Sequence, residues 1–399
     1  MIVVITLLVC VGTVQAEEWP TFKHDTQRTG YSDAPGPEND EIAWVFTADA
    51  GLSSPAVENY LVFVGSRGGF LYAVSIFNGK EVWKFEARGQ VSSPTFADGL
   101  VYFGSLDHSV YCLKTSDGAM LWEYETDGPI FTSPTVVAGA AYVTGSDGHV
   151  YSIDTTTGLL NWEKSIDYQM ASSPVVSGEL LIFGTGEKVV ALQLTDGTIT
   201  WIFNMGAPAP PDQLSVSTPA VTAGRVFMSS HGHIFALDTL TGAFIWDFQA
   251  DSRIESSPTV LINIAYFGLS DGYLYALDAR DNVTARVVWE YETEETIQSS
   301  PAVAGNKLFV ASQDGYLYSL EAMDGELLWR HQIGASGSSS PAIAYSKVFI
   351  GTEDGKLYCF GIWGSVSGDK LETGLIYVSI ALVLMILMWG LARLRLSKK

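Results

Sequence analysis

The stretch from Ser133 to Glu163, SPTVVAGAAYVTGSDGHVYSIDTTTGLLNWE, decides the fold, because it contains four short runs of β character separated by turn residues. The first run begins at a Ser-Pro pair, where a strand can lack one ladder donor. Asp147-Gly148 joins the second and third runs, and its glycine accepts a positive φ angle. Thr157-Gly158 marks the turn before the last run, which contains Trp162. The pattern predicts one four-stranded antiparallel unit.

The same unit recurs along the chain. A proline that follows Ser or Thr begins each copy, at Pro55, Pro94, Pro134, Pro174, Pro219, Pro258, Pro301 and Pro341. Tryptophan recurs in parallel, at Trp44, Trp83, Trp122, Trp162, Trp201, Trp246, Trp289 and Trp329. A period near 40 residues with four short strands is typical of propeller blades. We therefore predict an all-β fold, an eight-bladed β-propeller of four-stranded antiparallel blades over residues 42–363.

Closure of the ring follows from the order of these markers. Trp44 precedes every proline of the series, and no tryptophan at the expected distance follows Pro341. The strand around residues 42–45 should therefore supply the outer strand of the last blade. That pairing joins the two ends of the ring and removes an exposed sheet edge.

Composition limits the class of protein. The 399 residues are 47% hydrophobic and 17% charged, which excludes a disordered chain. The net charge of −22 argues against nucleic acid as a partner, since phosphates require Lys and Arg. Three cysteines form no disulfide framework. Cys112 and Cys359 occupy a position where every unit has a small residue, so we interpret them as core residues of different blades.

The two ends of the chain carry targeting signals. Residues 1–16 resemble a signal peptide with Ala16 at the cleavage site, followed by a leader over 17–41. An uncleaved anchor and a lipoprotein site at Cys10 are the alternatives. Residues 373–392 contain no charge and are long enough to span a bilayer as one helix. A linker over 364–372 precedes this segment, and a basic tail over 393–399 follows it.

Those signals predict a location. The tail contains four cations, which favour the cytoplasmic side of a membrane. We expect a single-pass protein of the cell membrane with the propeller outside and the C-terminus in the cytoplasm.

The unit from Phe235 to Trp246 resembles the repeat of pyrroloquinoline-quinone (PQQ) enzymes, and equally that of the BamB-type outer-membrane assembly lipoprotein. The leader from Trp19 to Ser32 is similar to that of secreted prokaryotic PQQ-like repeat proteins. The resemblance implies a propeller, and its repeated residues are structural. For quinone chemistry it would imply adjacent cysteines, a calcium-binding acid and a catalytic Asp. The sequence contains no Cys-Cys pair, so we expect no cofactor.

No catalytic or metal-binding motif stands out. His231 and His233 are spaced for one side of a strand, but zinc requires further ligands that are absent at a recognised spacing. Asp-Gly pairs such as Asp147-Gly148 lack the alternating oxygen ligands of a calcium loop. We interpret the histidines as solvated turn residues and the Asp-Gly pairs as hairpin turns.

Departures from the period indicate a binding surface, because insertions in repeat proteins lie in surface loops. The connection from Trp201 to Pro219 is 18 residues long, whereas most others are 11 or 12. Its prolines lower the entropy lost on docking. Glu255 and Gln298 each lie three residues before the proline of their unit, which should place them near the central axis. They are predicted contact residues, and the alternative is that they line a solvated channel. The predicted contact residues are Ile130, Phe131, Tyr168, Met170, Pro208, Pro210, Pro211, Asp212, Gln213, Glu255 and Gln298.

The sixth unit has extra residues at 280–285, which should lie on the opposite face. They include Asn282, in the one Asn-x-Ser/Thr sequon, which we predict to be glycosylated.

We expect a propeller that recognises a protein or glycan outside the cell without catalysis. An assembly factor of the BamB type and an enzyme, either a divergent PQQ-dependent dehydrogenase or a hydrolase using the central funnel, are the alternatives.

Overall fold

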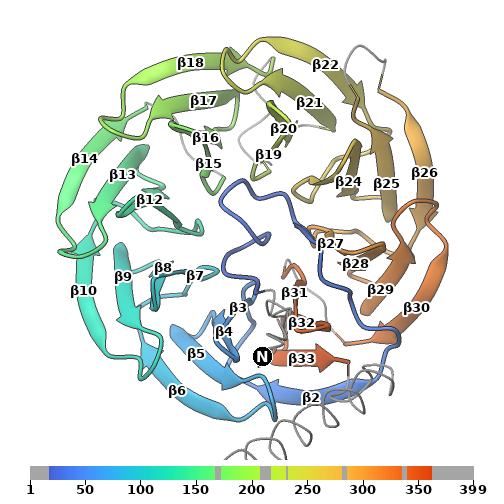
Figure 1. Cartoon of the computed structure of the whole chain (residues 1–399), viewed down its shortest axis with the longest axis horizontal. Helices are drawn as coiled ribbons and strands as arrows, with labels where there is room; N and C mark the ends of the chain where they lie inside the picture. Colours follow the sequence, from blue (N-terminus) through green and yellow to red (C-terminus); the bar gives the residue numbers. More distant parts are fainter. Residues whose placement is uncertain are drawn as a thin grey trace, which may run out of the picture. The chain divides into compact units, whose positions relative to one another are not determined.

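A computed structural model describes residues 18–166, 172–206, 217–230, 232–280, 285–334 and 339–361. Every regular element in those ranges is a β-strand, and Figure 1 shows eight sheets arranged as a ring. The predicted all-β, eight-bladed propeller is confirmed. The described ranges contain no helix with the length and apolarity to cross a membrane. The predicted signal peptide and the 373–392 segment lie outside them.

Each blade has its shortest strand next to the axis. Blades 1 to 4 consist of β3 (Ala56–Glu58), β4 (Leu61–Gly65), β5 (Phe70–Ser75) and β6 (Glu81–Glu86); β7 (Thr95–Ala97), β8 (Leu100–Gly104), β9 (Ser109–Lys114) and β10 (Met120–Glu125); β11 (Thr135–Val137), β12 (Ala140–Thr144), β13 (His149–Asp154) and β14 (Leu160–Ser165); β15 (Val175–Ser177), β16 (Leu180–Gly184), β17 (Lys188–Gln193) and β18 (Ile199–Asn204). Blades 5 to 8 consist of β19 (Ala220–Thr222), β20 (Arg225–Ser230), β21 (His233–Asp238) and β22 (Phe244–Gln249); β23 (Thr259–Leu261), β24 (Ile264–Gly268), β25 (Tyr273–Asp278) and β26 (Val287–Glu292); β27 (Ala302–Ala304), β28 (Lys307–Ala311), β29 (Tyr316–Glu321) and β30 (Leu327–Gln332); β31 (Ala342–Ala344), β32 (Lys347–Gly351), β33 (Lys356–Phe360) and β2 (Ile42–Thr47).

The last blade closes the ring as predicted. Its outermost strand, β2, comes from the N-terminal side of the chain and pairs antiparallel with β33, with Trp44 opposite Cys359. The small residue of each third strand, of which Cys359 is one, is buried. Cys112 and Cys359 are both free thiols in the core.

The ring has two distinct faces. On the top face, the connections between blades meet the turns between second and third strands, as shown by an isolated bridge between Leu52 and Ser66. On the bottom face, the turns between first and second strands meet those between third and fourth strands. Ile76 N donates there to Tyr60 O at 3.0 Å. The described start of the β25–β26 turn belongs to the bottom face, where Ala279 N donates to Asn263 O at 2.7 Å.

The turn glycine that recurs before the last strand of most units contacts the tryptophan of the preceding blade, not the tryptophan of its own blade. The indole of Trp122 donates to Thr155 O in the next blade at 2.9 Å. A Cβ on Gly158 of that turn would lie 2.6 Å from Cγ of the same indole. The other outer tryptophans with this pattern are Trp44, Trp83, Trp162, Trp201 and Trp289.

In most blades, the two hydroxyl residues before the proline have separate roles, although Ser299 of the seventh blade makes no hydrogen bond through its side chain. The first closes its own blade, as where the hydroxyl of Ser256 accepts from Gly268 N at 2.7 Å. The second links two blades, as where Ser300 Oγ accepts from Ser257 N at 3.0 Å. The ring is therefore held by polar bonds at its top inner edge and by indoles at its outer edge.

Candidate functional site

The axis of the ring is occupied by the leader of the same chain. Figure 1 shows the N-terminal segment crossing the centre, inside the innermost strands. Trp19 forms two backbone hydrogen bonds with Val57 of β3, and β1 (Tyr31–Ser32) pairs parallel with β27. We call residues Trp19–Ser32 the axial segment. The sequence predicted a leader here but not its path through the ring.

The axial segment satisfies the free edges of the innermost strands. The second residue after the blade proline points its N–H to the axis, as where Val260 N donates to Thr29 O at 2.9 Å. Equivalent donors are Val57, Phe96, Val176, Val221 and Val303. An unpaired backbone N–H inside a protein costs free energy comparable to a lost hydrogen bond. Backbone hydrogen bonds therefore attach the segment to six of the eight blades.

Arg28 attaches the axial segment to the third blade. Its guanidinium is fully buried and donates to Pro134 O at 2.9 Å, Thr135 Oγ1 at 2.9 Å and Thr21 Oγ1 at 2.6 Å. Burial lowers the pKa of Arg28 to about 9, and the charge of Asp25 opposes that shift. A rigid fork of donors suits a site with several acceptors and no contacting carboxylate.

A second buried basic side chain, Lys23, lies across the axis. Lys23 Nζ donates to Pro258 O in the sixth blade, and burial lowers the pKa of this amine well below its ordinary value. Asp25 accepts from Thr29 N at 3.0 Å and Thr29 Oγ1 at 2.5 Å. Burial raises the pKa of Asp25, but its hydrogen bonds from His24 and Thr29 outweigh that effect and lower it. These contacts hold the axial segment in one conformation and attach it to the sixth blade.

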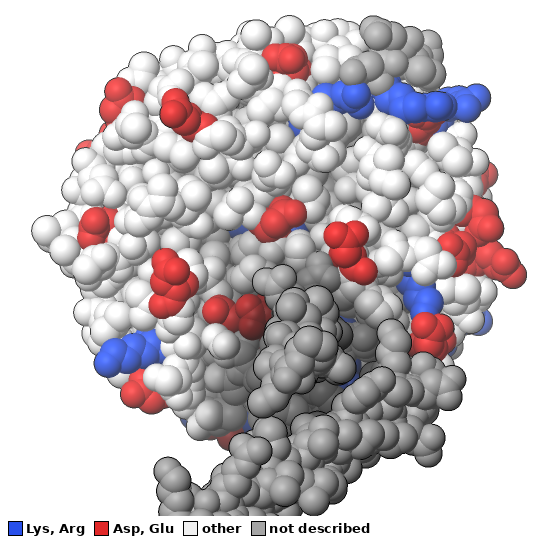
Figure 2. All heavy atoms as spheres, viewed as in Figure 1, with Lys and Arg blue, Asp and Glu red and all other residues white. Residues whose placement is uncertain are grey.

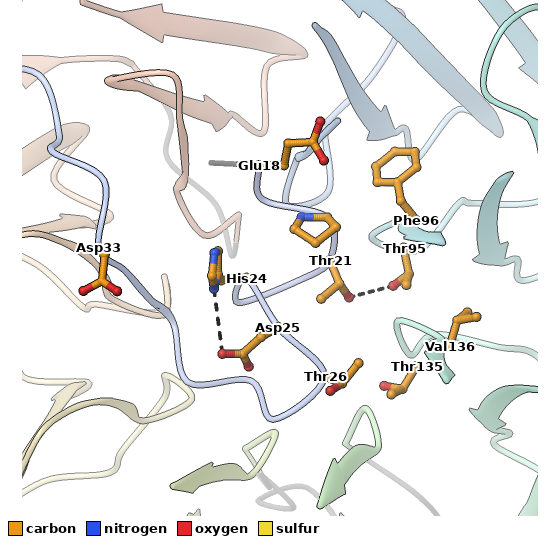
Figure 3. A pocket seen from close by; sticks show the side chains of 11 residues that line it. Glu18, Thr21, His24, Asp25, Thr26, Asp33, Thr95, Phe96, Thr135 and Val136 are labelled. Carbon is orange, nitrogen blue, oxygen red and sulfur yellow. Dashed lines mark hydrogen bonds and ion pairs between the residues drawn. The ribbon is translucent and has the colours of Figure 1, made fainter. Parts of the chain in front are cut away.

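A hollow of about 700 Å³ lies beside the axial segment. Figure 3 shows Glu18, His24, Asp25 and Asp33 around it, with Thr95 and Val136 from the inner strands on the far side. Thr21 and Thr95 join their hydroxyls at 2.7 Å on its wall. The lining of the hollow is about equally polar and apolar, and it includes the three carboxylates of Glu18, Asp25 and Asp33. It is the candidate small-ligand site among the described residues.

The predicted contact residues divide into three groups. Phe131 lies on the top face with 61% of its surface exposed. Glu255 is half-buried and pairs with Arg253 at 3.1 Å, and Gln298 is half-buried beside it in the ring order. Ile130 is fully buried against Gly104, so we correct its assignment and leave it out of the contact surface.

The remaining members of the predicted surface lie outside the described residues. They are Tyr168, Met170, Pro208, Pro210, Pro211, Asp212 and Gln213. The sequon residue Asn282 lies outside them as well.

The described cysteines and the centre of the ring do not fit the quinone site that the family resemblance implies. Cys112 and Cys359 are buried in different blades, and their thiols have pKa values raised by burial to about 12. The axial segment crosses the centre of the ring, where it is bonded to the inner strands, and a hollow lies beside it. Within the described ranges, no group of three or more His, Cys, Asp or Glu side chains is arranged for a metal ion. His233 pairs with Asp247 at 3.0 Å.

Sequence reasoning missed Lys23, Arg28 and the path of the leader. One signal was available: eight innermost strands leave eight rows of N–H groups facing the axis, and buried donors require partners. That accounting predicts a segment from outside the repeats, and the leader is the adjacent one.

Comparison with known proteins supports the architecture. The family model described as outer membrane protein assembly factor BamB matches residues 33–111, 94–231, 195–285 and 281–363. No curated protein matches the chain.

Solved structures resemble it at low sequence identity. BamB from Moraxella catarrhalis has a TM-score of 0.70 and 15% identity, covering 81% of this chain and all of that one (100%). A europium-containing methanol dehydrogenase has a TM-score of 0.73 and 14% identity, covering 87% of this chain and 98% of that one. The designed Ika8 protein has a TM-score of 0.71 and 17% identity, covering 81% and 100%. Likeness at such identities concerns the fold alone, which a binding protein, an enzyme and a designed ring share.

Proposed function

The chain belongs to the PQQ-like propeller family whose model is described as outer membrane protein assembly factor BamB, and from that premise we propose that it works by binding, without catalysis. We infer that residues 373–392 anchor it in the cell membrane with the ring outside. Its partner would be an extracellular protein or glycan, and the contact surface would be the top face.

The observation that carries this proposal is the axial segment. The central space, which an enzyme would use as a funnel, is crossed by residues that bond to the inner strands of the ring, and a hollow of about 700 Å³ remains beside them. A closed ring whose centre is obstructed in this way offers its turns and connections to other molecules. On the top face, the exposed ring of Phe131 is an aromatic anchor of the kind that dominates binding interfaces.

An assembly factor is the second candidate, because the matching family model carries that description. The two candidates differ in the partner: an assembly factor contacts membrane proteins during their insertion, whereas a receptor or scaffold contacts a folded molecule outside the cell.

Site-specific photo-crosslinking in native membranes tests the proposal. A photoreactive phenylalanine at Phe131 should capture the same protein or glycoprotein repeatedly, and one at Leu159, which is exposed on the bottom face, should not. Deleting residues 206–212 should weaken capture at Phe131 while the melting temperature stays nearly unchanged. Capture of nascent membrane proteins would favour the assembly factor.

An activity assay tests the dehydrogenase alternative. The purified protein with added PQQ and calcium should reduce no dye in the presence of alcohols or sugars. Turnover in that assay would reverse the ranking of functions.

A further inference from the structure

Exposed large apolar residues in the turns of the described ring gather on one face. Six such residues lie in bottom-face turns: Tyr60, Phe77, Leu159, Leu240, Ile262 and Met323. On the connections and turns of the top face, within the same ranges, Phe131 is the corresponding residue. Apolar side chains in protruding turns are a feature of surfaces that meet another apolar phase. Among the described turns and connections, those of the bottom face therefore expose more apolar side chains than those of the top face.

The strongest apolar patch lies where the sixth and seventh blades meet. Ile262 is 75% exposed in the β23–β24 turn, and Met323 is 54% exposed in the β29–β30 turn. They border a hollow of about 300 Å³ that is also lined by Ile264 and Val288. The lining is mainly hydrocarbon, so the hollow suits an acyl chain or an apolar side chain.

Two arginines stand at the rim of this patch. Arg280 donates to Asp278, with Nε 2.9 Å from Oδ1, and Arg286 Nε lies 3.6 Å from Oδ2 of the same carboxylate. Both cations remain more than half exposed and outnumber the carboxylate they share. Figure 2 shows basic side chains at this edge of the ring, near β26, with acidic side chains beside them. Guanidinium groups above an apolar hollow match a phosphate joined to a hydrocarbon chain.

A second apolar group lies on the same face where the described chain ends. The rings of Tyr60 and Phe77 stack with centroids 5.4 Å apart, and Tyr345 lies 5.0 Å from Tyr60. Gly361 lies close to the neighbouring turn, since a Cβ added to it would be 2.9 Å from Ser346 O. Aromatic side chains with one polar end are enriched at membrane interfaces.

The chain leaves the ring on this face with a short tether. Eleven residues, 362–372, separate Gly361 from the predicted spanning segment, and such a length reaches at most about 40 Å when fully extended. A tether that begins at the bottom face favours contact between that face and the lipid.

We propose that the bottom face rests on a phospholipid bilayer, with Ile262 and Met323 entering the headgroup boundary and Arg280 and Arg286 binding lipid phosphates. This inference rests on the proposed anchoring through residues 373–392. It leaves the top face, with Phe131, directed away from the membrane.

Quenching by lipid measures this orientation. Full-length protein with Ile262→Cys, labelled with an environment-sensitive fluorophore, is reconstituted in vesicles of phosphatidylcholine and phosphatidylglycerol that carry a shallow spin-label quencher. Phe131→Cys is the matched control, because it is an exposed apolar position on the opposite face. Both variants carry Asn282→Gln, so no glycan occupies the neighbouring turn. Insertion of a few ångströms should make quenching at position 262 at least about twofold stronger than at 131.

A further variant tests whether the arginines bind lipid phosphates. Arg286→Gln removes a cation that is 3.6 Å from Asp278 while Arg280 keeps its bonds to that carboxylate. It should reduce quenching at position 262 on the anionic vesicles.

The outcomes separate the two proposals. If the protein fails to float with vesicles, anchoring is wrong. If it floats but positions 262 and 131 are quenched equally, or 131 more strongly, the orientation alone is wrong. An unchanged signal in the Arg286 variant overturns the phosphate contact.

Discussion

Gly158 meets two requirements at once. Its φ angle is +71°, in the left-handed region that side chains disfavour, and its missing Cβ makes room for the indole of Trp122 from the preceding blade. Gly139 has a similar φ of +79° and no atom within 4 Å of an added Cβ. The pair separates backbone strain from contact between blades.

Substituting these glycines should give unequal losses of stability. Gly139→Ala should lower the free energy of unfolding by about 1–2 kcal/mol, the cost of a left-handed residue with a Cβ. Gly158→Ala should cost at least about 1 kcal/mol more, because the indole must move as well. Urea denaturation followed by fluorescence measures both. Equal losses would mean that the indole contact adds nothing.

Glu58 is a described residue whose charge depends on pH near neutrality. Burial, and then the charges of Glu18 and Asp98, raise the pKa of its carboxyl to about 7. The folded protein therefore holds a proton that the unfolded chain, with its ordinary pKa, has released. Stability from this group is present at low pH and is lost as pH rises to about 7.

The expected result is a melting temperature that falls between pH 5 and pH 8. Glu58→Gln should flatten this part of the profile, because the amide does not titrate. Asp98→Asn should shift the transition to lower pH, since it removes one of the charges that raise the pKa. Asn also tolerates the φ of 54° at that position. A profile with the same slope in the Glu58 variant would contradict the assignment.

At the scale of elements, the axial segment behaves as a ninth component of the ring. It has no regular pairing beyond β1, yet its carbonyl groups accept from the inner strands of six blades and Arg28 binds a seventh. Trp19, with 1% of its surface exposed, packs in the core between the first and last blades. The segment therefore shields sheet edges that a hollow ring would leave open.

Trp19→Ala should loosen this segment before it affects the blades. A buried tryptophan reduced to alanine costs about 3–5 kcal/mol in general. We expect faster hydrogen exchange at Val57 and Phe96, whose amides donate to Trp19 O and Pro20 O. The second and third strands of each blade should keep their protection in the same measurement by mass spectrometry. A uniform increase across all strands would show that segment and blades unfold as one unit.

At the scale of the whole ring, closure depends on non-covalent contacts, because the outermost strand of the last blade is not joined to that blade by a turn. β2 is joined to β33 by its ladder, and Trp44 reaches the first blade through Ile76 O at 2.8 Å. Trp83 makes the equivalent contact with Thr115 O at 2.9 Å, but its strand follows directly on its own blade. The two tryptophans differ mainly in this connectivity.

Trp44→Ala should therefore be more harmful than Trp83→Ala. We expect a lower melting temperature and, at high protein concentration, exchange of β2 between molecules, because an opened ring presents a free sheet edge. Light scattering after size-exclusion chromatography detects such oligomers. If the two variants melt together and both remain monomeric, ring closure does not depend on this strand.

The sequence was sufficient for everything that repeats. Blade number, turn positions and the pairing of the Trp44 strand with the last blade follow from local spacing, since each blade repeats the same short-range pattern of prolines, glycines and indoles. The predicted contact surface was harder: Phe131 is exposed, but Ile130 is buried, because adjacent residues of a connection point in opposite directions.

Folding in three dimensions added what has no period. Lys23 and Arg28 are not part of the repeat, and their hydrogen-bond partners lie 235 and 106 residues away in the chain. The spacing of the repeat therefore does not predict these contacts. The apolar residues of the bottom face come from turns of different blades and become a surface when the ring closes. The repeated sequence pattern determines contacts between neighbouring blades. The path of the axial segment and the apolar turns of the bottom face depend on many blades together, so they become visible only in the folded ring.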